Sequence, residues 1–153
     1  DIQTLLMTGE EKDALATEMK KVAGERNIDG FRRDGANVQD SQAVVLIGVR
    51  GTKKYGLNCG ACGYRDCMEY EMAEKKLGQD FMGPNCVFKL LDMGIALGSA
   101  AKMAMELNVD NRIMYRIGVA AKRLGLLPES SVIMGIPLSA KGKSIYFDRP
   151  VKT

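Results

Sequence analysis

The chain has 153 residues, 46% hydrophobic and 27% charged, which is the size and composition of one globular domain that folds without disulfide crosslinks. Its net charge of only +3, with scattered basic pairs, argues against nucleic acid as a partner. The absence of histidine excludes Ser-His-Asp and Cys-His catalysis, haem ligation by His and mixed Cys/His zinc sites.

Neither a signal peptide nor a membrane-spanning segment is evident in the sequence. The longest apolar run extends from Met93 to Ala101, bounded by Asp92 and Lys102. This is about half of the roughly 20 residues that a bilayer requires. We therefore expect a cytoplasmic protein that has no membrane partner.

The first third of the chain predicts a helix, a loop and a buried strand, in that order. Thr8 and Glu11 fit a capping box, and apolar residues then recur at helical spacing, so a helix should run from about 9 to 26. Residues 27–42 are mostly polar and include Gly30 and Gly35, which predicts a loop with at most a short turn of helix. Residues 43–49 form a continuous apolar, β-branched run typical of a buried strand.

The middle of the chain predicts a glycine-rich loop followed by two helices. Residues 51–64 carry the first two cysteines and read as loop, and residues 65–77 favour a helix with Cys67 in its first turn. Residues 84–107 are apolar nearly all round, the pattern of a long helix that is central and buried.

The last third predicts another helix and two strands. Asp110 is a candidate N-cap for a helix that ends at Gly125, and strands are expected at 131–136 and 143–147, joined by a turn. Together these elements predict an α+β fold in a single domain, 1–153, with a cysteine-containing segment, 56–88, inserted after the first strand.

The four cysteines are the residues that most directly indicate a function: Cys59, Cys62, Cys67 and Cys86. Gly60 and Gly63 give the first pair a backbone that can turn and direct N–H groups toward sulfur. Cys67 and Cys86 are both expected at helix N-termini, where the partial positive charge favours thiolates. Four thiolates with this spacing predict an iron–sulfur cluster, [4Fe–4S] in preference to [2Fe–2S], that transfers single electrons.

Other cysteine chemistries remain open. A structural Cys₄ zinc site without a redox role usually pairs two Cys-x₂-Cys knuckles, whereas this chain has one. A thioredoxin-type redox pair would leave Cys67 and Cys86 without a role, and two disulfides suit a secreted protein. Zinc is therefore the principal non-redox alternative.

Two stretches of the cysteine segment, 58–67 and 83–86, resemble the single-cluster four-iron domain of several anaerobic electron-transfer proteins. The chain as a whole resembles an uncharacterised prokaryotic family of ferredoxin-domain-containing proteins, through this segment, the helix at 92–98 and the ending at 136–143. The resemblance implies a [4Fe–4S] cluster on the four cysteines and an unidentified redox protein partner. It names no reaction, so an oxidoreductase activity stays open.

A fainter resemblance points to the flavin nitroreductase fold, in which a long buried helix packs on a small mixed sheet and FMN lies at a dimer interface. It implies a flavin-dependent reductase fed by the cluster as the alternative function, and a homodimer as the assembly. Lys141, Lys143 and Arg149 match the late basic residues that hold the FMN phosphate in that fold. The arginine-rich phosphate stretch that those enzymes carry near their start is not part of this sequence, so FMN is the weaker cofactor prediction.

Overall fold

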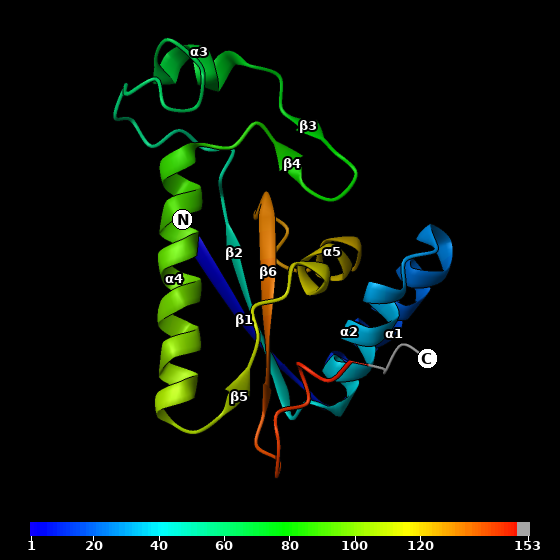
Figure 1. Ribbon diagram of the computed structural model, residues 1–153. Coiled ribbons are helices and arrows are strands. Elements are labelled where there is room, and N and C mark those ends of the chain that lie inside the picture. The colour runs from blue at the N-terminus through cyan, green and yellow to red at the C-terminus, as the bar shows by residue number, and fades with distance from the viewer. Residues whose placement is uncertain (150–153) are drawn as a thin grey trace.

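The computed structural model describes residues 1–149 and is built on a four-stranded antiparallel sheet of order β1-β2-β6-β5 (Figure 1). A separate two-stranded hairpin belongs to the cysteine segment. The strands are β1 Ile2–Thr8, β2 Ala43–Val49, β3 Lys76–Leu77, β4 Met82–Gly83, β5 Asp110–Asn111 and β6 Val132–Ser139. The helices are α1 Gly9–Arg26, α2 Asp29–Asp40, α3 Cys67–Met72, α4 Val87–Glu106 and α5 Tyr115–Arg123. The predicted α+β class is confirmed, with an antiparallel sheet in place of the mixed one.

The two faces of the sheet support two hydrophobic cores. On one face, Val44 and Leu46 of β2 pack against Leu15 of α1 and Ile117 of α5. On the other face, Ile47 and Val49 of β2 pack with α4. Because β2 lies between β1 and β6 and is covered on both sides, its sequence is a continuous apolar run without alternation.

Helix α5 lies unusually close to β6. A Cβ atom added to Gly118 would stand 1.6 Å from the carbonyl oxygen of Ile133, and one added to Gly135 would stand 2.0 Å from the side chain of Ile117. Only hydrogen fits at either position. These two glycines therefore set the distance between the helix and the sheet.

The predicted loop at 27–42 is wrong: residues 29–40 form helix α2. Its buried residues are Phe31, Asp34, Gly35 and Val38, which is helical spacing, but only two of them are large and apolar. The helix is held by α1, where the Lys12 ammonium donates to the Gln39 carbonyl at 2.8 Å. Tertiary packing thus stabilises a helix whose own sequence pattern is weak.

Other predicted elements change in length or in kind. Strand β1 was not expected, and the helix at 65–77 is reduced to α3. Asp110 lies in β5, and Met114 is the N-cap of α5. The predicted strand at 143–147 is irregular chain, because Tyr146 turns inward and its buried hydroxyl shares a 2.8 Å hydrogen bond with Ser41.

Helix α4 was expected to be buried all round, but only one face of it is. Met93 and Leu97 face the sheet and belong to the core, while Leu91 and Ile95 are 55% and 68% exposed. Figure 1 shows α4 lying alongside the sheet with its outer side free. Within residues 1–149, no helix is long and apolar enough to span a bilayer.

Candidate metal centre

The cysteines lie in an arm that projects beyond one end of the sheet, shown at the top of Figure 1. This arm comprises residues 51–86, between the end of β2 and the start of α4, and it includes most of the predicted segment 56–88. Cys59 and Cys62 lie on its irregular part, and Cys67 is the first residue of α3. Cys86 is the N-cap of α4. The expected placement of Cys67 and Cys86 at helix starts is confirmed.

The turn that carries Cys59 and Cys62 depends on glycine. Gly60 and Gly63 have φ angles of 66° and 88°, a region that residues with a Cβ rarely adopt, and the Gly63 N–H donates to the Gly60 carbonyl at 3.0 Å. The predicted role of these glycines in turning the backbone is confirmed.

Asn58 connects this turn to α3, a role that the sequence did not reveal. Its backbone N–H lies 3.3 Å from the Cys67 Sγ, and its side-chain oxygen accepts the backbone N–H of Cys67 at 3.1 Å. The two contacts hold the third cysteine against the loop of the first two.

The start of α3 is capped by Asp66, whose carboxylate accepts the N–H groups of Met68 at 3.0 Å and Glu69 at 2.9 Å. The hydrogen bond from Glu69, followed by that from the Arg65 side chain, lowers the pKa of Asp66 below its usual range. These N–H groups therefore serve the cap.

Cys86 is buried at the base of the arm, where a hydrogen-bond network fixes the chain on both sides of it. Its N–H donates to the Gly51 carbonyl at 2.8 Å. The Tyr70 hydroxyl lies 2.8 Å from that same carbonyl oxygen and 3.0 Å from that of Pro84. Ser131, from the segment before β6, accepts the Gly51 N–H at 2.9 Å and donates to the Asn85 side chain at 2.6 Å.

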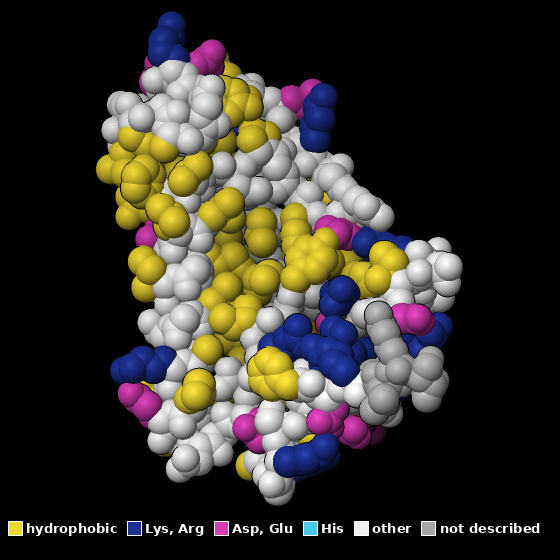
Figure 2. Space-filling model, in the orientation of Figure 1, with side chains coloured by type: hydrophobic (Ala, Val, Ile, Leu, Met, Phe, Trp, Pro, Cys, Tyr) yellow, Lys and Arg dark blue, Asp and Glu magenta, His cyan; other side chains and the backbone are white. Residues whose placement is uncertain are grey.

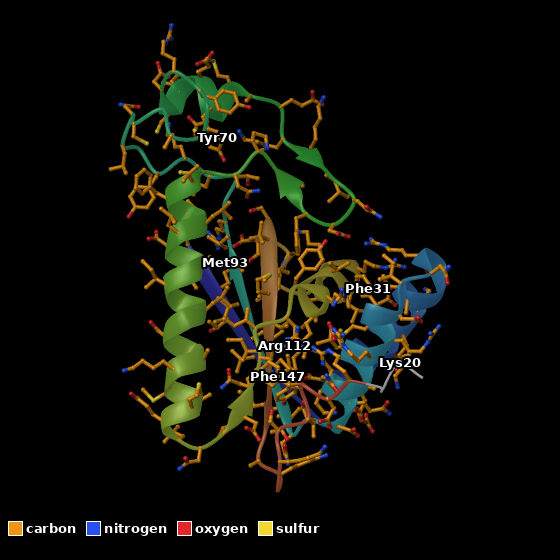
Figure 3. All side chains as sticks on the ribbon, in the orientation of Figure 1. Lys20, Phe31, Tyr70, Met93, Arg112 and Phe147 are labelled. Carbon is orange, nitrogen blue, oxygen red and sulfur yellow. The ribbon has the colours of Figure 1, made fainter. Side chains whose placement is uncertain are left out.

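Tyr70 stands between cysteines that are far apart in the sequence. Burial raises the pKa of Tyr70 to about 12, and the negative charges of the nearby Cys86 and Cys62 thiolates add to the increase. Figure 3 shows the ring inside the arm, beneath α3. Its position indicates that the arm brings Cys62 and Cys86 to the same region.

Lys75 supplies a cation beside Tyr70. Its ammonium lies 3.8 Å from the centroid of the Tyr70 ring and donates to the Tyr70 carbonyl. Burial lowers the pKa of Lys75, while the charges of Cys62 and Glu71 oppose this decrease. Lys75 therefore places a positive charge near Cys62.

The four sulfurs differ in exposure and are all free thiols: Cys59 is exposed, Cys62 and Cys67 are half-buried, and Cys86 is buried. Among residues 1–149, no three or more Cys, Asp or Glu are grouped tightly enough to hold one metal ion. A zinc site needs all its sulfurs about 2.3 Å from one ion. In an iron–sulfur cluster the thiolates bind different iron atoms, so its ligands lie further apart than those of a single ion.

The residues predicted to hold an FMN phosphate lie at the other end of the molecule, in the lower part of Figure 1. Lys143 pairs with the Asp148 carboxylate at 2.8 Å, and Arg149 donates to the Asp148 carbonyl at 2.7 Å, while Lys141 is exposed. Lys143 and Arg149 thus both contact Asp148, and the Asp148 carboxylate is paired with Lys143. Arg112, which the sequence did not suggest, stacks 5.5 Å from the Phe147 ring nearby (Figure 3).

Comparison with known proteins agrees with the site. Residues 56–75 match a family model for an Fe–S cluster, and residues 82–149 match the model described as "Uncharacterized protein containing a ferredoxin domain (DUF2148)". The first match contains Cys59, Cys62 and Cys67, and the second contains Cys86. An uncharacterized protein of Archaeoglobus fulgidus is 49% identical over 151 residues, which is 99% of this chain and 80% of that protein. This is an iron–sulfur protein, and the chain belongs to the family of uncharacterised proteins that contain a ferredoxin domain.

Proposed function

We propose that Cys59, Cys62, Cys67 and Cys86 hold one [4Fe–4S] cluster and that the protein transfers single electrons. The observation that carries this proposal is that one arm places Cys67 and Cys86 at the starts of α3 and α4, while Asn58 ties Cys67 to the loop of Cys59 and Cys62. It supports one shared site for cysteines that are separated in the sequence. The Fe–S match over residues 56–75 supports the same assignment.

When bound, such a cluster accepts and releases one electron at a time, at a potential set by its surroundings. The chain covers one side of the site more than the other. Tyr70 and the network around Cys86 exclude water from one side, and Asn58 donates a hydrogen bond to Cys67. The side of Cys59 is open to solvent, so we assign it as the side on which a redox protein partner exchanges electrons.

Anaerobic reconstitution with iron and sulfide tests the proposal. We expect about four iron and about four sulfide per chain, with the optical and paramagnetic spectra of a [4Fe–4S] cluster. The Cys62→Ser variant should lose most of this iron. The control is Met72→Ser, which changes a side chain that is 74% exposed in the same arm and should load normally.

The same preparation separates the alternatives. One zinc per chain in a colourless, air-stable protein would indicate a structural Cys₄ zinc site instead of a cluster. A flavin chromophore that copurifies in stoichiometric amount would favour the flavin-dependent reductase, with the cluster as its electron source. Equal iron content in Cys62→Ser and the unmodified chain would refute the ligand assignment.

A further inference from the structure

The outer face of α4 is apolar over most of its length. Its exposed residues between Val87 and Ser99 include no charged side chain: Val87, Leu90, Leu91, Gly94, Ile95, Gly98 and Ser99. The first exposed charges, Lys102 and Glu106, pair with each other at 2.9 Å. A helix at a protein surface normally carries charged or polar residues on its outer side, so an apolar one indicates a contact surface.

Two glycines lie in the middle of this face. A Cβ atom added to Gly94 or Gly98 would meet nothing within 4 Å. Nothing within the chain therefore requires glycine there, although glycine weakens a helix wherever it occurs in its interior. The space above them allows the backbone of a second element to approach α4 closely.

The sheet beneath α4 is only partly covered. Strands spaced about 4.8 Å apart form a surface wider than the roughly 10 Å that one helix covers. Val45, Met134 and Leu138 consequently remain half-buried. A cavity of about 280 Å³ lies between the end of α4 and the sheet, lined entirely by apolar residues such as Met103 and Val109. Figure 2 shows a continuous hydrophobic area over this region.

We propose that this face binds a second copy of the chain, giving a two-fold symmetric dimer in which the two α4 helices run antiparallel. Six positions along α4, 87, 91, 94, 98, 101 and 105, are small or apolar and are spaced symmetrically about Ala96, whereas Leu90 and Ile95 lie outside this set. In an antiparallel pair, Gly94 of one copy therefore faces Gly98 of the other, and Leu91 faces the smaller Ala101. A surface that is complementary to itself in this way is what a two-fold interface requires.

The uncharged face argues for an identical copy over a highly charged partner. The dimer does not depend on the cluster, and its test does not measure electron transfer.

Sedimentation equilibrium of the intact chain under anaerobic conditions tests the dimer. We expect twice the 16.7 kDa monomer mass at micromolar concentration. Ile95→Glu and Gly98→Leu should each raise the dimer dissociation constant at least tenfold, because one places a charge and the other a bulky side chain at the contact. The control is Leu77→Glu, at a residue that is 67% exposed in the arm, and it should leave the constant unchanged.

Thermal unfolding of each variant shows whether the monomer is intact, which we expect because both positions are open to solvent. A monomer mass for the unmodified chain at about 100 μM would overturn the proposal, since a stable interface of standard size associates well below that concentration. So would an unchanged dissociation constant in both α4 variants.

Discussion

Replacing Gly118 with alanine tests the packing of α5 on β6. The added Cβ would lie 1.6 Å from the Ile133 carbonyl oxygen, while ordinary contact begins near 3.4 Å. The helix and the strand must therefore separate by about 1.8 Å, in an interior that has little free volume. Because the obstructing atoms belong to the backbone, no side-chain rotation relieves the clash.

We expect Gly118→Ala to lower the free energy of unfolding by about 3 kcal/mol, the upper part of the range for overpacked cores. With a urea m-value of about 2 kcal/mol/M, the unfolding midpoint should fall by about 1.5 M. Urea titrations followed by far-ultraviolet circular dichroism measure this change. The matched control is Gly24→Ala in α1, where an added Cβ meets nothing within 4 Å. This control should stabilise the chain by up to about 1 kcal/mol, because alanine favours a helix over glycine.

A loss smaller than about 1 kcal/mol in Gly118→Ala would refute the close packing of α5 on β6. An equal loss in Gly24→Ala would show that the effect of Gly118→Ala does not come from the clash with Ile133. The two variants carry the same chemical change in two helices, so opposite signs can only reflect their surroundings.

Three further outcomes follow from the site and from the buried tyrosines. Tyr70→Phe leaves the Gly51 carbonyl without its hydroxyl donor, and it should cost about 1–3 kcal/mol and speed iron loss to a chelator, measured by absorbance under anaerobic conditions. Burial raises the pKa of Tyr146 to about 12, as it does that of Tyr70, so the folded chain holds these protons more tightly than the unfolded chain. These two groups should therefore leave stability unchanged below pH 10 and lower it between pH 10 and 12. A Tyr146→Phe variant whose thermal midpoint falls over this range as steeply as that of the unmodified chain would contradict the assignment. Lys75→Gln removes a cation near Cys62, and it should lower the reduction potential of the reconstituted protein by an amount on the order of tens of millivolts. Protein-film voltammetry measures this shift, and an unchanged potential would exclude an electrostatic effect of Lys75 on the site.

Strong periodicity made several elements predictable from the sequence. The apolar spacing in α1 and the continuous apolar run of β2 each indicated the correct element, because burial of one helical face or of both strand faces leaves a clear pattern. The Thr8 capping box, however, does not form: Thr8 occupies the N-cap but makes no side-chain hydrogen bond. A local motif of this kind can be overridden by the backbone geometry of the neighbouring strand.

Elements that depend on distant contacts could not be predicted in the same way. Helix α2 has few apolar residues and is stabilised by α1, and Tyr146 is drawn out of a predicted strand by Ser41. The outer face of α4 misled the prediction for a different reason. Its residues are as apolar as a core, which the sequence alone cannot distinguish from burial within the chain.

The candidate site, too, could be predicted only in part from the sequence. The four cysteines and the turn glycines follow from residue type and spacing. Asn58 and Ser131 do not, because their roles come from contacts with Cys67 and Asn85 that only the folded chain creates. An asparagine directly before the first cysteine was the only local sign of this support.

The hydrogen bond between the Cys86 N–H and the Gly51 carbonyl joins the two ends of the arm at its neck. An insertion whose ends already meet costs the host domain little beyond the entropy of closing one loop. We therefore expect the sheet and its helices to stay folded in the chain without metal, with any loss of order confined to the arm.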